Sequence, residues 1–296
     1  MHIPSSMLHG QVCPVTLSVG VVGVGLAAYY ARRQEQKPSA VKFSAIAALV
    51  FALQMLNYPV LNGTSGHLVG AMLAVSFLGV PFAVLAMTIV LAVQAVLFGD
   101  GGVNALGANI INMAFLGAGL AGFLLNRMTQ KGVSRPLALG LGALMSVILG
   151  AVACSFEVAF SGVVALNKVL PAMLSVHLLI GLGESILTVL VVSAFKSFYL
   201  KEKTFAAGSF ALAIMAASLS PFASRLPDGL EWVAGTLSFK QFSGWNTPVL
   251  FPDYQTAFIH QTGYSTIIAG LLGVGIVSAV TFLAGRIVLA RRRIVS

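Results

Sequence analysis

Charged residues are scarce in this sequence. Asp, Glu, Lys and Arg together make up 8% of its 296 residues, whereas 58% of the residues are hydrophobic. A soluble domain carries about 25% charged residues, so the composition excludes a soluble fold and predicts a chain embedded in a lipid bilayer. Short linkers and one longer loop, 223–263, separate the apolar runs, which leaves no room for a soluble catalytic domain. We therefore expect an all-α, polytopic bundle of membrane helices.

Motifs for catalysis are missing as well. The sequence lacks the phosphate-binding pattern G-x-x-x-x-G-K-[ST], and we interpret D-G-G at 100–102 as a turn. None of its five histidines lies four residues from another, as the H-E-x-x-H motif of a zinc hydrolase requires. A passive channel would need a ring of acidic residues at its mouth, but the acidic residues are scattered. An intramembrane metal-dependent hydrolase and a passive metal channel are therefore minor alternatives.

The apolar runs predict about nine membrane helices, against the roughly 20 residues that a tilted helix needs. The run 67–80 is short and flanked by glycine, so a half-span or a steep segment that ends at the Gly79-Val80-Pro81 turn is expected there. The nine runs cover residues 12–30, 43–60, 67–80, 82–98, 105–126, 136–160, 171–198, 205–222 and 264–289.

The basic residues predict the orientation. The net charge is +9, but Lys and Arg cluster at the ends of apolar runs without interleaved aromatic residues, which is typical of membrane topology and argues against nucleic-acid binding. If the clusters are cytoplasmic, the chain begins outside and ends in the cytoplasm, and His2 and His67 share the outer side. The clusters are Arg32, Arg33, Lys37 and Lys42; Arg127, Lys131 and Arg135; Lys196, Lys201 and Lys203; and Arg291, Arg292 and Arg293.

Met1 and His2 form a candidate metal site. We expect Met1 to be retained with a free amine, because the large His2 disfavours methionine removal and no signal cleavage site follows. The amine, the amide nitrogen of residue 2 and Nδ1 of His2 close a five-membered and a six-membered chelate ring around one ion. His67 is the natural fourth nitrogen of a square-planar site, which suits Ni(II) or Cu(II) rather than Zn(II). Because the ion displaces protons, its affinity should fall at low pH.

Several separate motifs carry a family resemblance. The opening M-H-I-P and the stretches N-G-T-S-G-H-L-V-G (62–70), L-F-G-D-G-G-V-N-A-L-G-A-N-I-I-N-M (97–113) and H-L-L-I-G-L-G-E-S-I-L-T (177–188) resemble the substrate-binding M subunit of nickel and cobalt energy-coupling-factor transporters. P-D-G-L-E (227–231) is similar to the motif of the small N subunit of these transporters. The order of the motifs predicts a fusion of an M-like part, 1–204, with an N-like part, 205–296.

The resemblance implies a multi-pass component of a prokaryotic cell membrane that captures a transition metal from outside. It implies partnership with a transmembrane coupling subunit and cytosolic ATPase subunits, and metal ligands at Met1, His2 and His67. The T-S-G-H-L form is more similar to the nickel branch than to the cobalt branch, so Ni(II) is the expected substrate and Co(II) the alternative. Ser5-Ser6-Met7 departs from the family pattern after M-H-I-P, which leaves affinity and metal preference open.

Further polar residues are candidates for supporting this site. Thr64 and Ser65 belong to the loop of His67, and His177 and Glu184 share a helix face because they lie two turns apart. We favour hydrogen bonds that fix the bundle for this His–Glu pair, with a functional pair as the alternative.

The asparagines of the stretch 101–122 and the acidic residues of P-D-G-L-E each have two interpretations. Asn104, Asn109 and Asn112 either line a cavity or bridge helices, with equal weight. The small residues around them predict close helix packing. We interpret Asp228 and Glu231 as part of a structural turn rather than as residues that deliver metal to the site.

Overall fold

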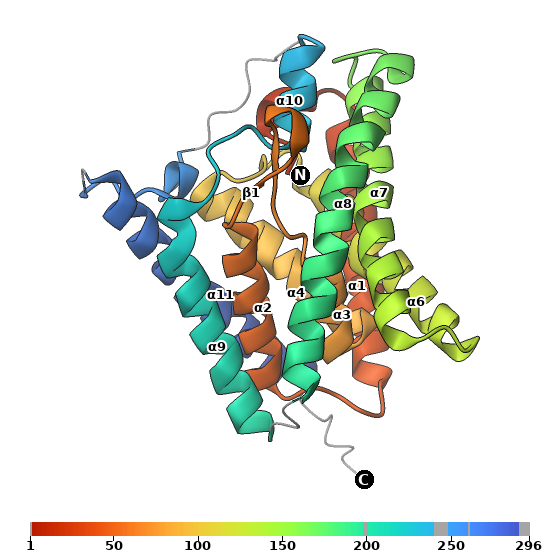
Figure 1. Ribbon diagram of the computed structural model, residues 1–296, viewed down its shortest axis with the longest axis vertical. Coiled ribbons are helices and arrows are strands. Elements are labelled where there is room, and N and C mark those ends of the chain that lie inside the picture. Colours follow the sequence, from red (N-terminus) through yellow and green to blue (C-terminus); the bar gives the residue numbers. More distant parts are fainter. Residues whose placement is uncertain (1, 198–200, 240–247, 260, 290–296) are drawn as a thin grey trace.

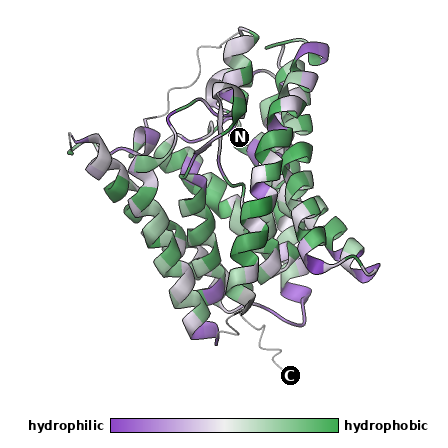
Figure 2. Ribbon diagram, viewed as in Figure 1, coloured by the Kyte–Doolittle hydropathy of each residue, from purple (hydrophilic) through white to green (hydrophobic). Residues whose placement is uncertain are grey.

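A computed structural model describes residues 2–197, 201–239, 248–259 and 261–289 of the chain. The predictions for Met1 and for Arg291, Arg292 and Arg293 fall outside these residues. The chain folds into a bundle whose long helices run side by side along one axis (Figure 1). Hydrophobic residues dominate the middle of the bundle and hydrophilic residues gather toward its two ends (Figure 2). This banding is the pattern that a bilayer imposes on a membrane protein.

Seven stretches of the described chain are long and apolar enough to cross a membrane. They comprise α1 (Val12–Arg33), α4 (Val80–Val93) continued by a π-helix (Gln94–Phe98), α5 (Leu106–Asn109) continued by a second π-helix (Ile110–Leu120) and α6 (Ala121–Gln130), α7 (Arg135–Phe160), α8 (Leu166–Ser197), α9 (Glu202–Leu219) continued by a 3-10 turn (Ser220–Phe222), and α11 (Thr262–Leu289).

Shorter elements complete the described chain. They are a 3-10 turn at Ser5–Met7, α2 (Ala40–Gln54), the two-stranded hairpin of β1 (Tyr58–Pro59) and β2 (Ser65–Gly66) with a 3-10 turn at Leu61–Gly63 between the strands, α3 (Ala71–Leu78), α10 (Gly229–Thr236) and a 3-10 turn at Pro252–Tyr254.

The all-α membrane class is confirmed, whereas two of the nine expected runs are shorter than a span. The run at 43–60 yields α2, which ends at Gln54 because the chain then turns into the β1–β2 hairpin. The run at 67–80 yields α3, whose eight residues extend for about 12 Å. As expected, α3 ends before Gly79, and α4 begins at Val80. Gly79 has a φ of +77°, which is readily adopted only by glycine.

The N-like part packs against α2. Both of its long helices, α9 and α11, contact α2, which also contacts α4 of the M-like part. The longer loop between the runs 205–222 and 264–289 contains a helix, α10, that hydropathy did not reveal because it is only eight residues long. In Figure 1, α10 lies at the opposite end of the bundle from the end of α1, the end of α6 and the start of α9. Those three places carry Arg33, Arg127 and Lys201.

Close packing in the stretch 101–122 is confirmed where α1 crosses α5. A Cβ atom built at Gly107 would overlap the backbone of Thr16 and Leu17 in α1. On the other side of this crossing, a Cβ at Gly20 would lie 3.6 Å from Cα of Gly107. Glycine is therefore required at position 107 to let the two backbones touch, as in other close contacts between membrane helices.

We expect Gly107→Ala to destabilise the bundle, because the added methyl group must push α1 away from α5. Overpacking of this kind costs about 1–3 kcal/mol, which thermal unfolding of the detergent-solubilised protein would detect. Gly25→Ala is the matched control, since a Cβ at Gly25 in α1 meets no atom within 4 Å. Equal unfolding temperatures for the two variants would contradict this packing.

Candidate functional site

The first residues of the described chain are inserted into the bundle. Ile3 is fully buried, and His2 is 8% exposed. The amide of Asn109 holds the backbone of Ile3 from both sides: its Oδ1 accepts a hydrogen bond from Ile3 N at 2.9 Å, and its Nδ2 donates to Ile3 O at 3.2 Å. Gly102 N also donates to Ile3 O, at 2.9 Å. These bonds satisfy a buried backbone and fix the place of the adjacent His2.

The Asp100-Gly101-Gly102 turn is confirmed, and its glycines make room for the inserted segment. Gly101 has a φ of +81°. A Cβ on Gly101 would lie 2.8 Å from Nδ2 of Asn109, and one on Gly102 would overlap Ser5. Glycine is needed at both positions for the turn to contact the inserted segment.

His2 and His67 lie together, as their shared side of the membrane predicted. Their rings stack at 18°, with 5.2 Å between the centroids. Both side chains are buried, and burial lowers the pKa of His67 to about 3. His67 Nδ1 lies 3.1 Å from the carbonyl oxygen of Leu68. A carbonyl only accepts, so Nδ1 is the protonated nitrogen and Nε2 of the neutral ring keeps its lone pair.

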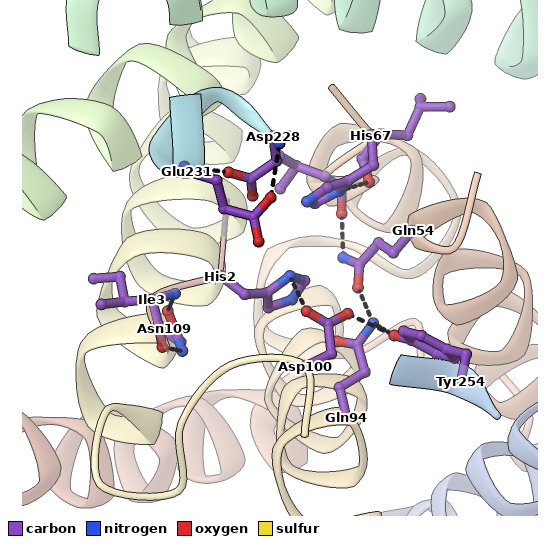
Figure 3. A network of polar contacts seen from close by, with 12 residues as sticks. His2, Ile3, Gln54, His67, Gln94, Asp100, Asn109, Asp228, Glu231 and Tyr254 are labelled. Atoms are coloured by element: carbon purple, nitrogen blue, oxygen red, sulfur yellow. Dashed lines mark hydrogen bonds and ion pairs between the residues drawn. The ribbon is translucent and has the colours of Figure 1, made fainter. Parts of the chain in front are cut away.

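Asp100 contacts the nitrogen of His2 that the chelate requires. His2 Nδ1 lies 3.1 Å from Asp100 Oδ1 (Figure 3). Burial alone would raise the pKa of Asp100, but its contacts with His2 and Tyr254 hold that pKa below the usual range. To close the predicted chelate, Nδ1 must turn from this carboxylate to the ion. Sequence reasoning missed the role of Asp100, and its one signal was its position in the motif 97–113.

Glu184 fixes the loop after His67. The carboxylate of Glu184 accepts hydrogen bonds from Val69 N at 2.7 Å and from Gly70 N at 3.0 Å. The side chain of Gln54 donates to Val69 O at 2.7 Å. Glu184 thus satisfies the start of α3 and orients the His67 loop, which agrees with the interpretation that it fixes the bundle.

His177 does not contact Glu184 or join the histidine pair. Its Nδ1 donates to Met173 O of the same helix at 2.8 Å. Its Nε2 is buried without a hydrogen-bond partner. A Cβ on Gly229 would lie 2.8 Å from Cε1 of His177. This close approach seats the P-D-G-L-E segment on α8.

The two asparagines have different neighbours. Asn112 donates to Glu157 Oε2 of α7 at 2.7 Å, which matches the helix-bridging interpretation. Asn109 instead holds Ile3, next to His2. The hydrogen-bond partners of both side chains are protein groups, as is that of Asn104, whose Nδ2 donates to Ser5 O at 3.2 Å.

The P-D-G-L-E segment docks on the loop that carries His67. Pro227 O accepts from Ser65 N at 2.8 Å and from Thr64 Oγ1 at 3.1 Å. Asp228 and Glu231 close a reciprocal capping box at the start of α10, with bonds of 2.8 and 3.0 Å. The expected structural turn is therefore present, and Figure 3 shows its two carboxylates on the same side of the site as His67.

A chain of polar side chains joins the surroundings of the two histidines (Figure 3). Tyr254 of the N-like part donates to Asp100 Oδ2 at 2.6 Å. Gln94 Nε2 lies 3.3 Å from the hydroxyl of Tyr254 and 2.8 Å from Oε1 of Gln54. Gln54 completes the chain at the carbonyl of Val69. None of these three residues was singled out from the sequence.

Side chains alone do not make a closed metal site here. Among the described residues, no group of three or more His, Cys, Asp and Glu side chains is placed to hold a metal ion. A metal ion between His2 and His67 would therefore need ligand atoms other than these side chains.

Comparison with known proteins places the chain in a transport family. Residues 2–202 match the CbiM model, described as the cobalt uptake substrate-specific transmembrane region, and residues 202–290 match the PDGLE domain. A putative fused nickel transport protein NikMN of Archaeoglobus fulgidus is 34% identical, over 95% of this chain and 97% of its own. A cobalt transport protein CbiM of Thermosediminibacter oceani is 32% identical, over 65% of this chain and 83% of its own.

A solved structure agrees with these matches. The crystal structure of a truncated transition metal transporter superimposes with a TM-score of 0.61 at 30% identity, covering 68% of this chain and all of that one. The chain therefore belongs to the CbiM family of cobalt uptake substrate-specific transmembrane regions, as a fused M and N membrane component of nickel or cobalt transport.

Proposed function

We propose that this chain captures Ni(II) as the substrate of an ATP-driven importer. Four nitrogens would hold the ion: the amine of Met1, the amide and Nδ1 of His2, and Nε2 of His67. The observation that carries the proposal is the stacked, buried pair of His2 and His67, 5.2 Å apart. Two imidazoles alone are too few for a structural zinc site, whereas with the chain end they complete a square-planar set that suits Ni(II).

The charges around the His2–His67 pair favour the binding of a cation. Asp100 contributes a negative charge beside His2, and its pKa lies below the usual range, so it is ionised at neutral pH. Since the pKa of His67 is lowered to about 3, its imidazole is neutral at neutral pH. The loss of affinity at low pH therefore comes mainly from protons that compete for the amine and the amide.

The names of the fused relatives favour nickel over cobalt as the proposed substrate. The Archaeoglobus fulgidus protein, similar over nearly the whole length, is named a nickel transport protein. The fused NikMN of Rhodobacter capsulatus, 26% identical over 99% of both chains, carries the same name. The cobalt-named CbiM of Thermosediminibacter oceani matches 65% of this chain, so Co(II) is the second candidate.

In this proposal the chain is a non-enzymatic component of a prokaryotic cell membrane, with the end that carries α10 outside and the end that carries Arg33 and Arg127 in the cytoplasm. Energy comes from cytosolic ATPase subunits through a transmembrane coupling subunit. The outward side chains of α1 suit contact with lipid and with that subunit, since Val15, Val21 and Leu26 are all more than half exposed. The M-like part ends near residue 204.

One added residue before Met1 should abolish nickel binding, because it removes the amine from the chelate while leaving both histidines in place. Isothermal titration of the purified protein with Ni(II) would measure the loss, and the unfolding temperature would show that the fold is retained. Undiminished affinity in a correctly folded extended chain would rule out the amine as a ligand.

His67→Ala should weaken nickel binding by about 100-fold or more, because it removes one of the four proposed bonds to the ion. Changing a residue that only supports a metal ligand already lowers affinity by about 10–100-fold. The yellow absorption band of square-planar Ni(II) should disappear with it. His9→Ala is the matched control, because His9 is exposed on the same side. If both variants kept the band, His67 would not be a ligand.

A further inference from the structure

The N-like part reaches the surroundings of His2 through a short segment before α11. Phe251 N donates to Leu97 O at 2.8 Å, which anchors the segment at the end of the first π-helix. The ring of Tyr254 stacks on Phe98, with 4.8 Å between the centroids and 29° between the planes. A buried cluster of aromatic rings therefore sets where the hydroxyl of Tyr254 points.

That hydroxyl points at the carboxylate that holds His2. Tyr254 donates to Asp100 Oδ2 at 2.6 Å, while Asp100 Oδ1 lies 3.1 Å from His2 Nδ1. The two oxygens of one carboxylate are thus engaged on opposite sides, one by the N-like part and one by the proposed metal ligand. A carboxylate bonded at both oxygens has a single orientation, so Tyr254 determines which way Asp100 faces.

The backbone that presents Tyr254 is strained. Asp253 and Tyr254 have φ values of +50° and +57°, in the left-handed region that residues other than glycine rarely adopt. Strain of this kind persists only where surrounding contacts hold it, and it is concentrated at functional sites. Here the contacts that hold it are the anchor at Leu97, the stack on Phe98 and the bond to Asp100.

We propose that Tyr254 is a positioning residue for the metal site: it fixes Asp100, and in the metal-free chain Asp100 holds the imidazole of His2 beside that of His67. The N-like part thereby shapes the metal ligands of the M-like part without contacting the ion. Because the ring of His2 already lies beside that of His67, little orientation is lost when Nδ1 moves from the carboxylate to the ion, and the charge of Asp100 stays next to the bound cation. The inference rests on the proposed capture of Ni(II) by His2 and His67.

The test is nickel titration of the full-length protein and of Tyr254→Phe, which removes the hydroxyl and keeps the stacking ring. We expect Ni(II) affinity to fall by about 10-fold or more, as is typical when a residue behind a metal ligand is changed. Tyr264→Phe is the matched control, because Tyr264 is 62% exposed in the same N-like part. Unchanged or tighter binding by a folded Tyr254→Phe protein would overturn the proposal.

A double-mutant cycle separates positioning through Asp100 from simple packing. Asp100→Asn keeps the shape of the side chain and removes its charge, and we expect it to weaken Ni(II) binding at least as much as Tyr254→Phe. Adding Tyr254→Phe to Asp100→Asn should then change the affinity by less than about 2-fold, because the two residues act through one contact. Losses that multiply would show that Tyr254 acts independently of Asp100, contrary to the proposal.

The Asp100→Asn variant and the wild-type protein separate the role of Tyr254 from the proposed function. If Tyr254→Phe does not fold, judged by its unfolding temperature, Asp100→Asn still decides, since wild-type affinity in that variant would exclude a route through Asp100. If the wild-type protein itself binds no Ni(II), the proposed function fails. Nickel binding by the wild type together with unaltered binding by Tyr254→Phe would overturn only the role of Tyr254.

Discussion

The structure depends on the burial of a peptide backbone near the start of the chain. An amide group taken out of water without a partner costs about 1–3 kcal/mol, so residues 2–8 can enter the bundle only where the bundle supplies hydrogen bonds. Asn109 supplies two of them to Ile3, and Gly102 supplies a third. The position of His2 follows directly, because it is the neighbour of a residue held on both its N–H and its carbonyl.

The loop that carries His67 is likewise held by hydrogen bonds to its buried backbone. His67 lies in a loop between β2 and the short helix α3, and Glu184 satisfies the amides of Val69 and Gly70 at the start of that helix. A buried carboxylate is costly unless it is hydrogen-bonded, and here its two bonds fix the loop. Both histidines are thus positioned through hydrogen bonds to the backbone next to them.

The fused N-like part contributes to both halves of this arrangement. Its P-D-G-L-E segment accepts hydrogen bonds from Thr64 and Ser65, two and three residues before His67. Its Tyr254 bonds to Asp100, which contacts His2. The fusion therefore places two stretches of the N-like part against the loops that carry the proposed ligands, which ties the geometry of the site to the packing of α9 and α11 on α2.

Part of this could be predicted from the sequence because it depends on local pattern. Hydropathy predicted the all-α membrane fold, chain topology predicted that His2 and His67 lie together, and small residues around Gly107 predicted close packing. Hydropathy did not show that α2 ends at Gln54, since the apolar run in which it lies continues to residue 60. The bond between Tyr254 and Asp100 joins residues 154 apart, and no local pattern predicts such a contact. The ligand set at Met1, His2 and His67 stays a prediction.

Asp100 gives the proposed site a property that suits a transported ion better than a resident one. If His2 Nδ1 coordinates Ni(II), the same nitrogen needs a partner when the ion leaves, because a buried polar group without one is costly. Asp100 Oδ1, 3.1 Å from Nδ1, is that partner. Asp100 therefore balances the two states: it is the partner of Nδ1 in the empty site and a negative charge beside the cation in the loaded site. A site that must release its metal on every transport cycle requires such a balance, whereas a structural metal site does not.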